Sequence, residues 1–158
     1  MATRNIVILG NETLRKMSKP VERFDESLAK LLDDMKDTMI QRRGVGIAGV
    51  QVGVLRRVIV IEVDDGEYLE IINPVILKTK GKVTASEGCL SIPNFYTNVP
   101  RPKYVKIKAQ NRNGNFFEFE ANDYIARCVC HEIDHLNGVL FVDLTDEGRA
   151  YKAEKGVK

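Results

Sequence analysis

The sequence predicts an α+β fold in which antiparallel strands and hairpins pack around a late helix that carries an HExxH motif. Three observations predict this class: an amphipathic helix near residues 25–43, two strand–turn–strand patterns in the middle of the chain, and a second amphipathic helix only after them. Successive strands followed by a late helix indicate α+β, because a parallel α/β sheet alternates strands with helices.

Length and composition indicate one domain, residues 1–158, of which 44% are hydrophobic. A chain of this size can remove ~70% of its unfolded surface from water. The net charge is only +2, so no large field of one sign favours DNA or a membrane surface as partner. No apolar run approaches the roughly 20 residues that span a bilayer, and the N-terminus lacks a leader pattern, which predicts a cytoplasmic protein.

The first helix is predicted from its apolar spacing. Leu28, Leu31, Leu32, Met35 and Met39 form one stripe, Asp25 can cap the N-terminus, and Arg42 and Arg43 suit the C-terminal end, with Gly44 in the left-handed conformation just beyond it.

Two hairpins are predicted next. Residues 58–61 and 68–72 flank the turn Asp64-Asp65-Gly66, with the second strand ending before Asn73-Pro74. Residues 105–110 and 115–120 flank Asn113-Gly114, which favours a two-residue turn.

The second helix is predicted to begin near Asn122 or Asp123 and to stop at Asn137-Gly138. Its apolar residues, Ile125, Cys128, Val129, Ile133 and Leu136, predict that it is buried.

Both histidines of the chain, His131 and His135, lie on this helix, separated by four positions. That spacing places two imidazoles on one face, one turn apart, which is metal-ligand geometry. A surface helix could carry the same pattern by chance, but a buried, unpaired imidazole pair would be costly without a ligand. The pattern therefore favours a metal site.

A catalytic metal usually takes three protein ligands, so one more is needed. Cys89 is the best candidate, because Gly88 permits a tight backbone and Pro93 marks an edge or irregular segment. Cys128 is a rival ligand, but we expect it to line a pocket or to belong to the core. Cys130 points about 100° away from His131 on the helix, so we expect its side chain to pack in the protein interior rather than bind the metal. Three cysteines without a secretion signal also argue against a disulfide framework.

The glycine-rich segment at residues 44–53 lacks both the Gly-Lys-Ser/Thr ending of a phosphate loop and a preceding strand. The alternative is an edge along which another backbone can lie, with Gln51 offering an amide donor.

Taken together, GVGIAGVQ (44–51), EGCLS (87–91) and HEIDH (131–135), in that order, resemble the peptide deformylase family. The N-terminal ILGNETLRKMSKPV and the stretch down to LNGVLFVD extend the resemblance over nearly the whole chain. The chain departs from the usual family residues at four positions: Gly49 for Ala, Asn94 for Gly, Asp123 for Gly and Cys130 for Gln.

The resemblance implies a hydrolase that removes the formyl group from N-formylmethionine of nascent polypeptides, with one divalent metal, natively Fe(II), and with Zn, Ni or Co as substitutes in purified protein. It implies that Cys89, His131 and His135 are the ligands and that Glu132 accepts the proton of the attacking water and returns it to the departing amine. The resemblance also implies that the Gln51 side chain and the Leu90 backbone N–H donate hydrogen bonds to the formyl oxygen as it becomes negatively charged. It implies that the substrate backbone pairs with Val45 and Gly46 and that Arg101 lies near that backbone. The methionine side chain would occupy a pocket lined by Val45, Tyr124 and Cys128.

Two other readings stay open. In a zinc endopeptidase of the general HExxH kind, Glu147 or Glu154 would be the third ligand. In a catalytically silent paralogue the metal would only stabilise the fold. Glu132 argues against this alternative, because a purely structural metal site needs no acid/base carboxylate.

The tail from Asp146 is predicted as a short helix or a frayed end. In this family a basic C-terminal helix can dock on the ribosome, and the tail has only a weak basic bias, which is a weak indication of a ribosomal partner.

Overall fold

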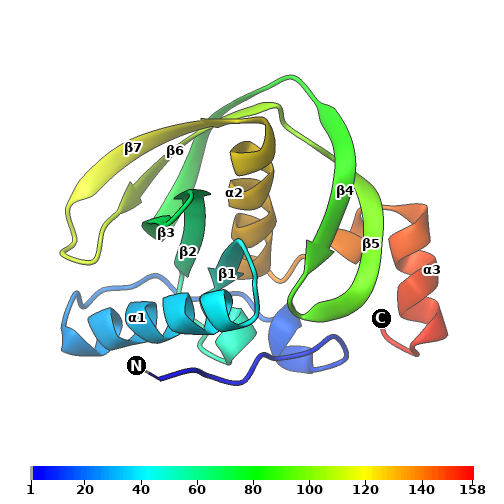
Figure 1. Cartoon of the computed structure of the whole chain (residues 1–158), viewed down its shortest axis with the longest axis horizontal. Helices are drawn as coiled ribbons and strands as arrows, with labels where there is room; N and C mark the ends of the chain where they lie inside the picture. Colours follow the sequence, from blue (N-terminus) through cyan, green and yellow to red (C-terminus); the bar gives the residue numbers. More distant parts are fainter. Residues whose placement is uncertain (1) are drawn as a thin grey trace.

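The computed structural model describes residues 2–158 and has the predicted α+β class, with antiparallel sheets around a central helix (Figure 1). Its helices are α1 (Glu26–Gln41), α2 (Asp123–Leu136) and α3 (Asp146–Glu154), with short 3-10 segments at Glu12–Arg15, Gly49–Val52 and Phe141–Asp143. Within residues 2–158, none of these helices has the length and apolar character that crossing a bilayer requires.

The strands form two antiparallel sheets on either side of α2 (Figure 1). The larger sheet has the order β1-β2-β3-β6-β7, with β1 (Gly46–Ala48), β2 (Val58–Asp64), β3 (Glu67–Lys80), β6 (Tyr104–Gln110) and β7 (Phe116–Asn122). The smaller sheet pairs β4 (Val83–Cys89) with β5 (Ile92–Arg101). Among the described residues, β1 pairs only with β2, so it is an edge strand whose other side is open for pairing.

Helix α1 forms as predicted, with one correction at its end. The Asp25 side chain accepts a hydrogen bond from the backbone N–H of Leu28, and the whole predicted stripe is buried. The left-handed residue after the helix is Arg43 (φ 57°), not Gly44. Gly44 instead packs closely on the Leu90 side chain, because a Cβ atom there would lie 2.7 Å from Leu90 Cδ1.

The first hairpin is confirmed as β2 and β3, but the predicted end of its second strand was wrong. Strand β3 continues through Asn73-Pro74 to Lys80, with a register shift between Ile72 and Val75. Asn73 adopts φ 53°, and its side chain bonds both the N–H and the carbonyl of Val21. This local bulge accommodates the proline inside a continuing strand.

The second hairpin is confirmed as β6 and β7, but the two-residue turn was wrong. Gln110 pairs with Phe116, so residues 111–115 form the connection. The Asn111 side chain accepts hydrogen bonds from the N–H groups of Asn113 and Asn115 and stabilises this longer loop.

Helix α2 begins and ends where the sequence predicts, and it is buried in the main core. Val129 and Leu136 are fully buried among residues of the larger sheet such as Ile59 and Ile107. The sequence did not predict β4 and β5 as strands, yet β4 is the element that brings Cys89 to the side of α2.

Candidate metal centre

Three ligand-type side chains converge between β4 and α2. Cys89 lies at the end of β4, whereas His131 and His135 lie one turn apart on α2 with ring centroids 5.0 Å apart. One ligand atom from each of the three residues lies within 4.8 Å of the others, and Cys89 Sγ is 3.2 Å from His135 Nε2. Both imidazoles are buried, and burial lowers the pKa of His135 well below 6.5. The neutral form of His135, which binds metals, is therefore favoured.

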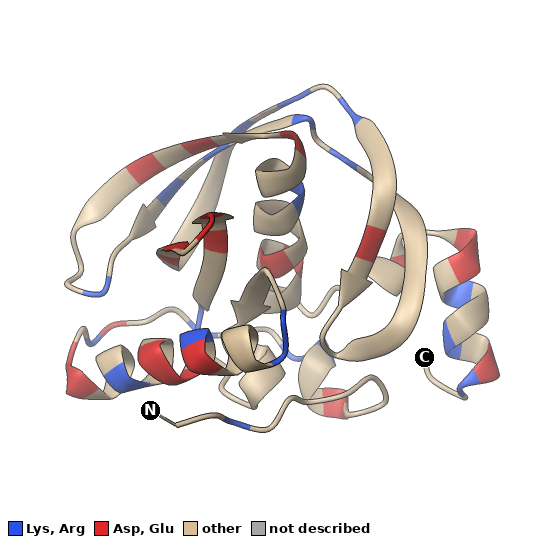
Figure 2. Cartoon of the chain, viewed as in Figure 1, with Lys and Arg blue, Asp and Glu red and all other residues tan. Residues whose placement is uncertain are grey.

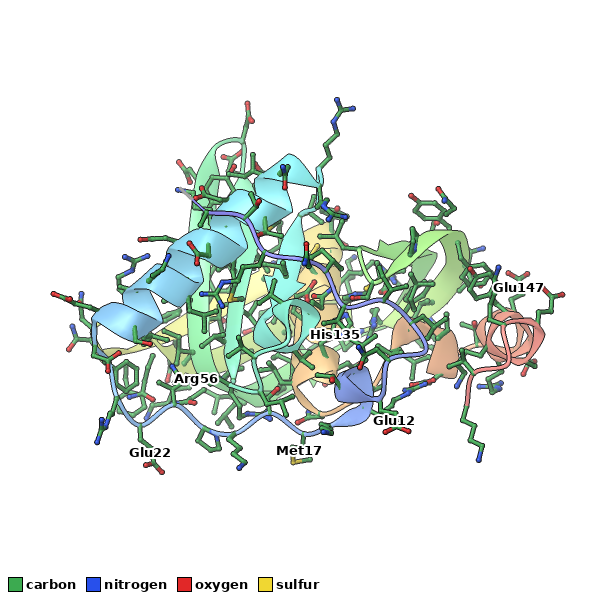
Figure 3. All side chains as sticks on the ribbon, turned by 90° about the horizontal axis from the view of Figure 1, so that it is seen from below. Glu12, Met17, Glu22, Arg56, His135 and Glu147 are labelled. Atoms are coloured by element: carbon green, nitrogen blue, oxygen red, sulfur yellow. The ribbon has the colours of Figure 1, made fainter. Side chains whose placement is uncertain are left out.

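The rival ligands lie outside this cluster. Cys128 and Cys130 are buried on α2, and burial raises the pKa of their thiols, to about 12 and about 11. Glu147 accepts a hydrogen bond from Thr97 at 2.9 Å. Figure 3 shows Glu147 on α3 at the periphery, away from the central His135, and Glu154 lies at the end of the same helix. The zinc endopeptidase hypothesis therefore lacks the glutamate that it requires as third metal ligand.

The residues present fit a divalent metal. One thiol and two imidazoles are the donors that bind zinc, iron and other late first-row metals. Their donor atoms point at one another in the interior, where the attraction of a cation would offset the crowding of three lone-pair donors.

Glu87 on β4 holds the imidazole of His131. Glu87 Oε2 lies 2.8 Å from His131 Nδ1, which leaves Nε2 of that ring for the cluster. Arg101 donates two hydrogen bonds to Glu87, at 2.8 and 2.9 Å, and Arg127 donates a third at 3.0 Å. Burial alone would raise the pKa of Glu87, but the hydrogen bonds from Arg101 and His131 lower it to about 2. The carboxylate therefore stays ionised.

Arg101 does not lie where the resemblance placed it. Its side chain is 6% exposed, bonds Glu87 and, at 2.6 Å, Asp134, and does not line the cavity in front of the cluster. Asp134 thus contacts Arg101 rather than an imidazole.

Glu132 lies beside the cluster with a free oxygen. Its side chain is buried, and within residues 2–158 its Oε1 atom has no hydrogen-bond partner. Burial raises the pKa of Glu132 to about 7. A carboxyl group with this pKa can both accept and return a proton near neutral pH.

The side chain of Gln51 is oriented by a hydrogen bond from the nearby backbone N–H of Ala48. Its Oε1 accepts a hydrogen bond from Ala48 N–H at 2.9 Å, so its Nε2 faces Cys89 Sγ at 3.5 Å and Ser91 Oγ at 3.3 Å. The amide N–H groups are therefore directed toward the cluster.

A cavity of about 470 Å³ opens in front of these residues. Its lining includes most of the residues expected from the sequence: Val45, Gly46, Gln51, Cys89, Leu90, Tyr124, Cys128, His131 and Glu132. It also includes Arg42, Arg43, Asn94 and Tyr96, which sequence reasoning did not assign to the site. The arginine pair directly precedes the glycine-rich segment, and that adjacency was the available signal.

Comparison with known proteins agrees with this geometry. The polypeptide deformylase family model matches residues 3–150. The chain belongs to the peptide deformylase family. It is 53% identical to the peptide deformylase of Caldicellulosiruptor bescii over 143 residues, which cover 90% of this chain and 86% of that protein. It is also 53% identical to peptide deformylase 1 of Clostridium acetobutylicum, at 90% and 95% coverage.

Solved deformylase structures share the fold. The Legionella pneumophila enzyme superposes with a TM-score of 0.92 at 46% identity, covering 98% of this chain and 93% of that one. The Synechococcus elongatus enzyme, solved in complex with actinonin, gives 0.91 at 38% identity, covering 98% and 87%. As a peptide deformylase, the protein is a metal-dependent hydrolase that removes the N-formyl group from nascent polypeptides.

Two departures from the usual deformylase sequence have a backbone explanation. Asn94 (φ 65°) and Asp123 (φ 52°) both adopt the left-handed conformation that favours glycine, the residue that the family resemblance led us to expect at these positions. Asparagine and aspartate tolerate this conformation better than other side chains, so the backbone path is kept.

Proposed function

We propose that Cys89, His131 and His135 hold the single divalent metal of this deformylase, Fe(II) natively, with Zn, Ni or Co able to replace it in purified protein. The observation that carries the proposal is the convergence of these three donors beside a buried carboxylate with a free oxygen, in one cavity. When bound, the metal supplies Lewis acidity and lowers the pKa of water toward neutrality.

Glu132 is the group that moves the proton. Its free Oε1 accepts the proton of the attacking water and then returns it to the α-amine as the formyl C–N bond breaks, so that formate and a free N-terminus leave. The pKa of about 7 suits both transfers.

Gln51 and Leu90 stabilise the charge that develops on the formyl oxygen. The Gln51 amide donates from its Nε2, which is directed by the Ala48 contact, and Leu90 donates from its backbone N–H. Loss of one such donor typically costs ~100-fold in rate.

The substrate backbone pairs with the open side of the chain at Val45 and Gly46, and methionine occupies a pocket of Val45, Tyr124 and Cys128. Backbone pairing requires no particular side chain, which suits many nascent sequences. Arg101 acts as a positioning residue: it holds Glu87, which in turn holds His131.

The substrate class implies a cytoplasmic location, where formylated chains emerge during synthesis. The C-terminal helix α3 has little free basic charge with which to bind the ribosome. Two basic side chains of α3 are engaged within the chain, Lys152 with Asp143 and Arg149 with Asp146.

A matched pair of cysteine variants tests the ligand assignment. Cys89→Ala is expected to lose bound metal and formate release together, whereas Cys130→Ala, also a thiol replacement near the site, keeps both. Metal content per chain and formate release from formyl-Met-Ala-Ser are measured on the same anaerobic preparations. A Cys89→Ala protein that retains one metal per chain would refute the assignment.

A further inference from the structure

The rim of the catalytic cavity carries two arginines for which the reaction has no use. Arg42 and Arg43, in the connection from α1 to β1, are exposed and line the same cavity as Cys89 and Glu132. Within residues 2–158 neither side chain makes an ion pair or a hydrogen bond, whereas the buried Arg127 of the same cavity is paired with Glu87. Figure 2 shows this basic connection beside β1, on the side that faces the β4–β5 hairpin.

The backbone fixes these arginines at the rim. Arg43 adopts φ 57°, a conformation in which glycine is the favoured residue after a helix. The next residue, Gly44, packs so closely on Leu90 that a Cβ atom would lie 2.7 Å from Leu90 Cδ1. The connection is therefore held against the segment that carries Cys89, and both arginines stay at the cavity mouth.

The direction of the substrate follows from the order of the site residues along β1. Gln51, which faces Cys89, lies beyond the end of β1, and Glu132 lies against Gly46 at its start. With the formyl group held between Gln51 and Glu132, a peptide that lies antiparallel to β1 extends past Val45 toward Arg43. At about 3.3 Å per residue, the third and fourth substrate residues reach the arginine pair.

Within the described residues 2–158, no acidic side chain at the rim offsets this charge. The acidic residues that line the cavity are Glu87 and Glu132, and both are buried. The opposite wall carries Asn94 and Tyr96, which are exposed and uncharged, with the Tyr96 ring over Gly88. The exit path of the peptide therefore has a net positive charge.

We propose that Arg42 and Arg43 form a subsite that favours formylated peptides with acidic side chains at their third and fourth residues. This inference rests on the proposed function, because it uses the proposed path of the substrate along β1. An exposed opposite-charge contact is worth about two- to fivefold, so two contacts predict roughly a four- to 25-fold preference for acidic over neutral peptides at low salt. Repulsion between like charges makes the preference for acidic over basic peptides larger still.

The test compares kcat/KM for formyl-Met-Ala-Glu-Glu, formyl-Met-Ala-Lys-Lys and formyl-Met-Ala-Ala-Ala. The readout is the Glu-to-Lys ratio on one enzyme preparation, so differences in metal loading or folding cancel. In the native protein this ratio is expected to exceed about four and to fall toward one as salt rises, because exposed charges are screened. It should approach one in Arg42→Gln/Arg43→Gln and fall below one in Arg42→Glu/Arg43→Glu.

Arg23→Glu is the matched control, because Arg23 is exposed and precedes the opposite end of α1. It changes the net charge without touching the rim and should leave the ratio unchanged. A native ratio near one, a ratio unaffected in the glutamine variant, or an equal fall in Arg23→Glu would overturn the subsite. Hydrolysis of the neutral peptide separates this failure from that of the proposed function, since a metal-loaded protein that cleaves none of the three peptides contradicts both.

Discussion

Gly46 lies directly against the carboxylate of Glu132. A Cβ atom at position 46 would come within 2.7 Å of Glu132 Oε2 and 3.2 Å of its Cγ. Gly46 on the edge strand β1 therefore limits where the carboxylate of Glu132, the proposed proton carrier, can lie. Gly46 thus contacts the catalytic helix α2 from the strand that faces the substrate.

Gly46→Ala should lower kcat by about 100-fold, because a displacement of a catalytic group by about 1 Å can have that effect. The metal content should remain one per chain, since the ligands are untouched. Steady-state formate release and metal analysis measure the two quantities. Gly66→Ala is the control: Gly66 adopts φ 74°, so alanine there strains a turn that does not line the cavity, and the variant should lose some stability but keep its kcat.

Glu87→Gln should weaken metal binding about 10- to 100-fold, the usual effect of losing the group that orients a ligating histidine. The variant also removes the charge that Arg101 and Arg127 share. A competition titration with a chelator gives the affinity. Asp134→Asn, which touches Arg101 but not the imidazole, should weaken binding less, and an equal effect in both variants would argue against the role of Glu87.

Asp143 should make stability depend on pH in the acid range. Burial raises the pKa of this carboxyl, but hydrogen bonds from Arg15 and Lys152 outweigh it and lower the pKa to about 2. A lowered pKa in the folded state means that the ionised form stabilises the fold above about pH 4, and that this stabilisation disappears as the pH falls toward 2.

Urea unfolding of the native protein and Asp143→Asn across this range measures the effect. The native protein should be more stable at pH 7, and the difference should shrink below about pH 4. A difference that stays constant from pH 7 to pH 3 would contradict the ion-pair explanation.

Gly49→Ala should destabilise the fold by about 1–3 kcal/mol, although the family resemblance led us to expect alanine at this position. A Cβ atom at Gly49 would lie 2.9 Å from both the Val54 carbonyl oxygen and Val58 Cγ2. Because the Val54 oxygen belongs to the backbone, it cannot move away as a side chain can. Denaturant unfolding measures the change, and an unchanged midpoint would show that the segment relaxes freely.

The sequence predicted most where local rules decide the structure. The stripe from Leu28 to Met39, the cap at Asp25 and the spacing of His131 and His135 depend on residues close together in the chain, and the structure has all of them. The α+β class also followed from local patterns, because strand and helix periods differ.

The sequence-based predictions failed where the structure depends on contacts between residues that are far apart in the chain. Gly44 packs against Leu90 of a distant segment, and β3 continues past Pro74 because the Asn73 side chain forms hydrogen bonds with the backbone of Val21. Arg101 lies behind Glu87 because β5 and β4 pair and place it beside α2, which no local pattern showed. The same non-local packing places Arg42 and Arg43 at the cavity rim.

The most direct test of the account is formate release from formyl-Met-Ala-Ser by anaerobically purified, Fe(II)-loaded protein, with a folded and equally loaded Glu132→Gln variant beside it. The native protein should release formate, and the variant should release at least about 100-fold less, because the proton carrier is missing. Equal release by both proteins would contradict the role of Glu132, and no release by the loaded native protein would favour a site in which the metal is only structural.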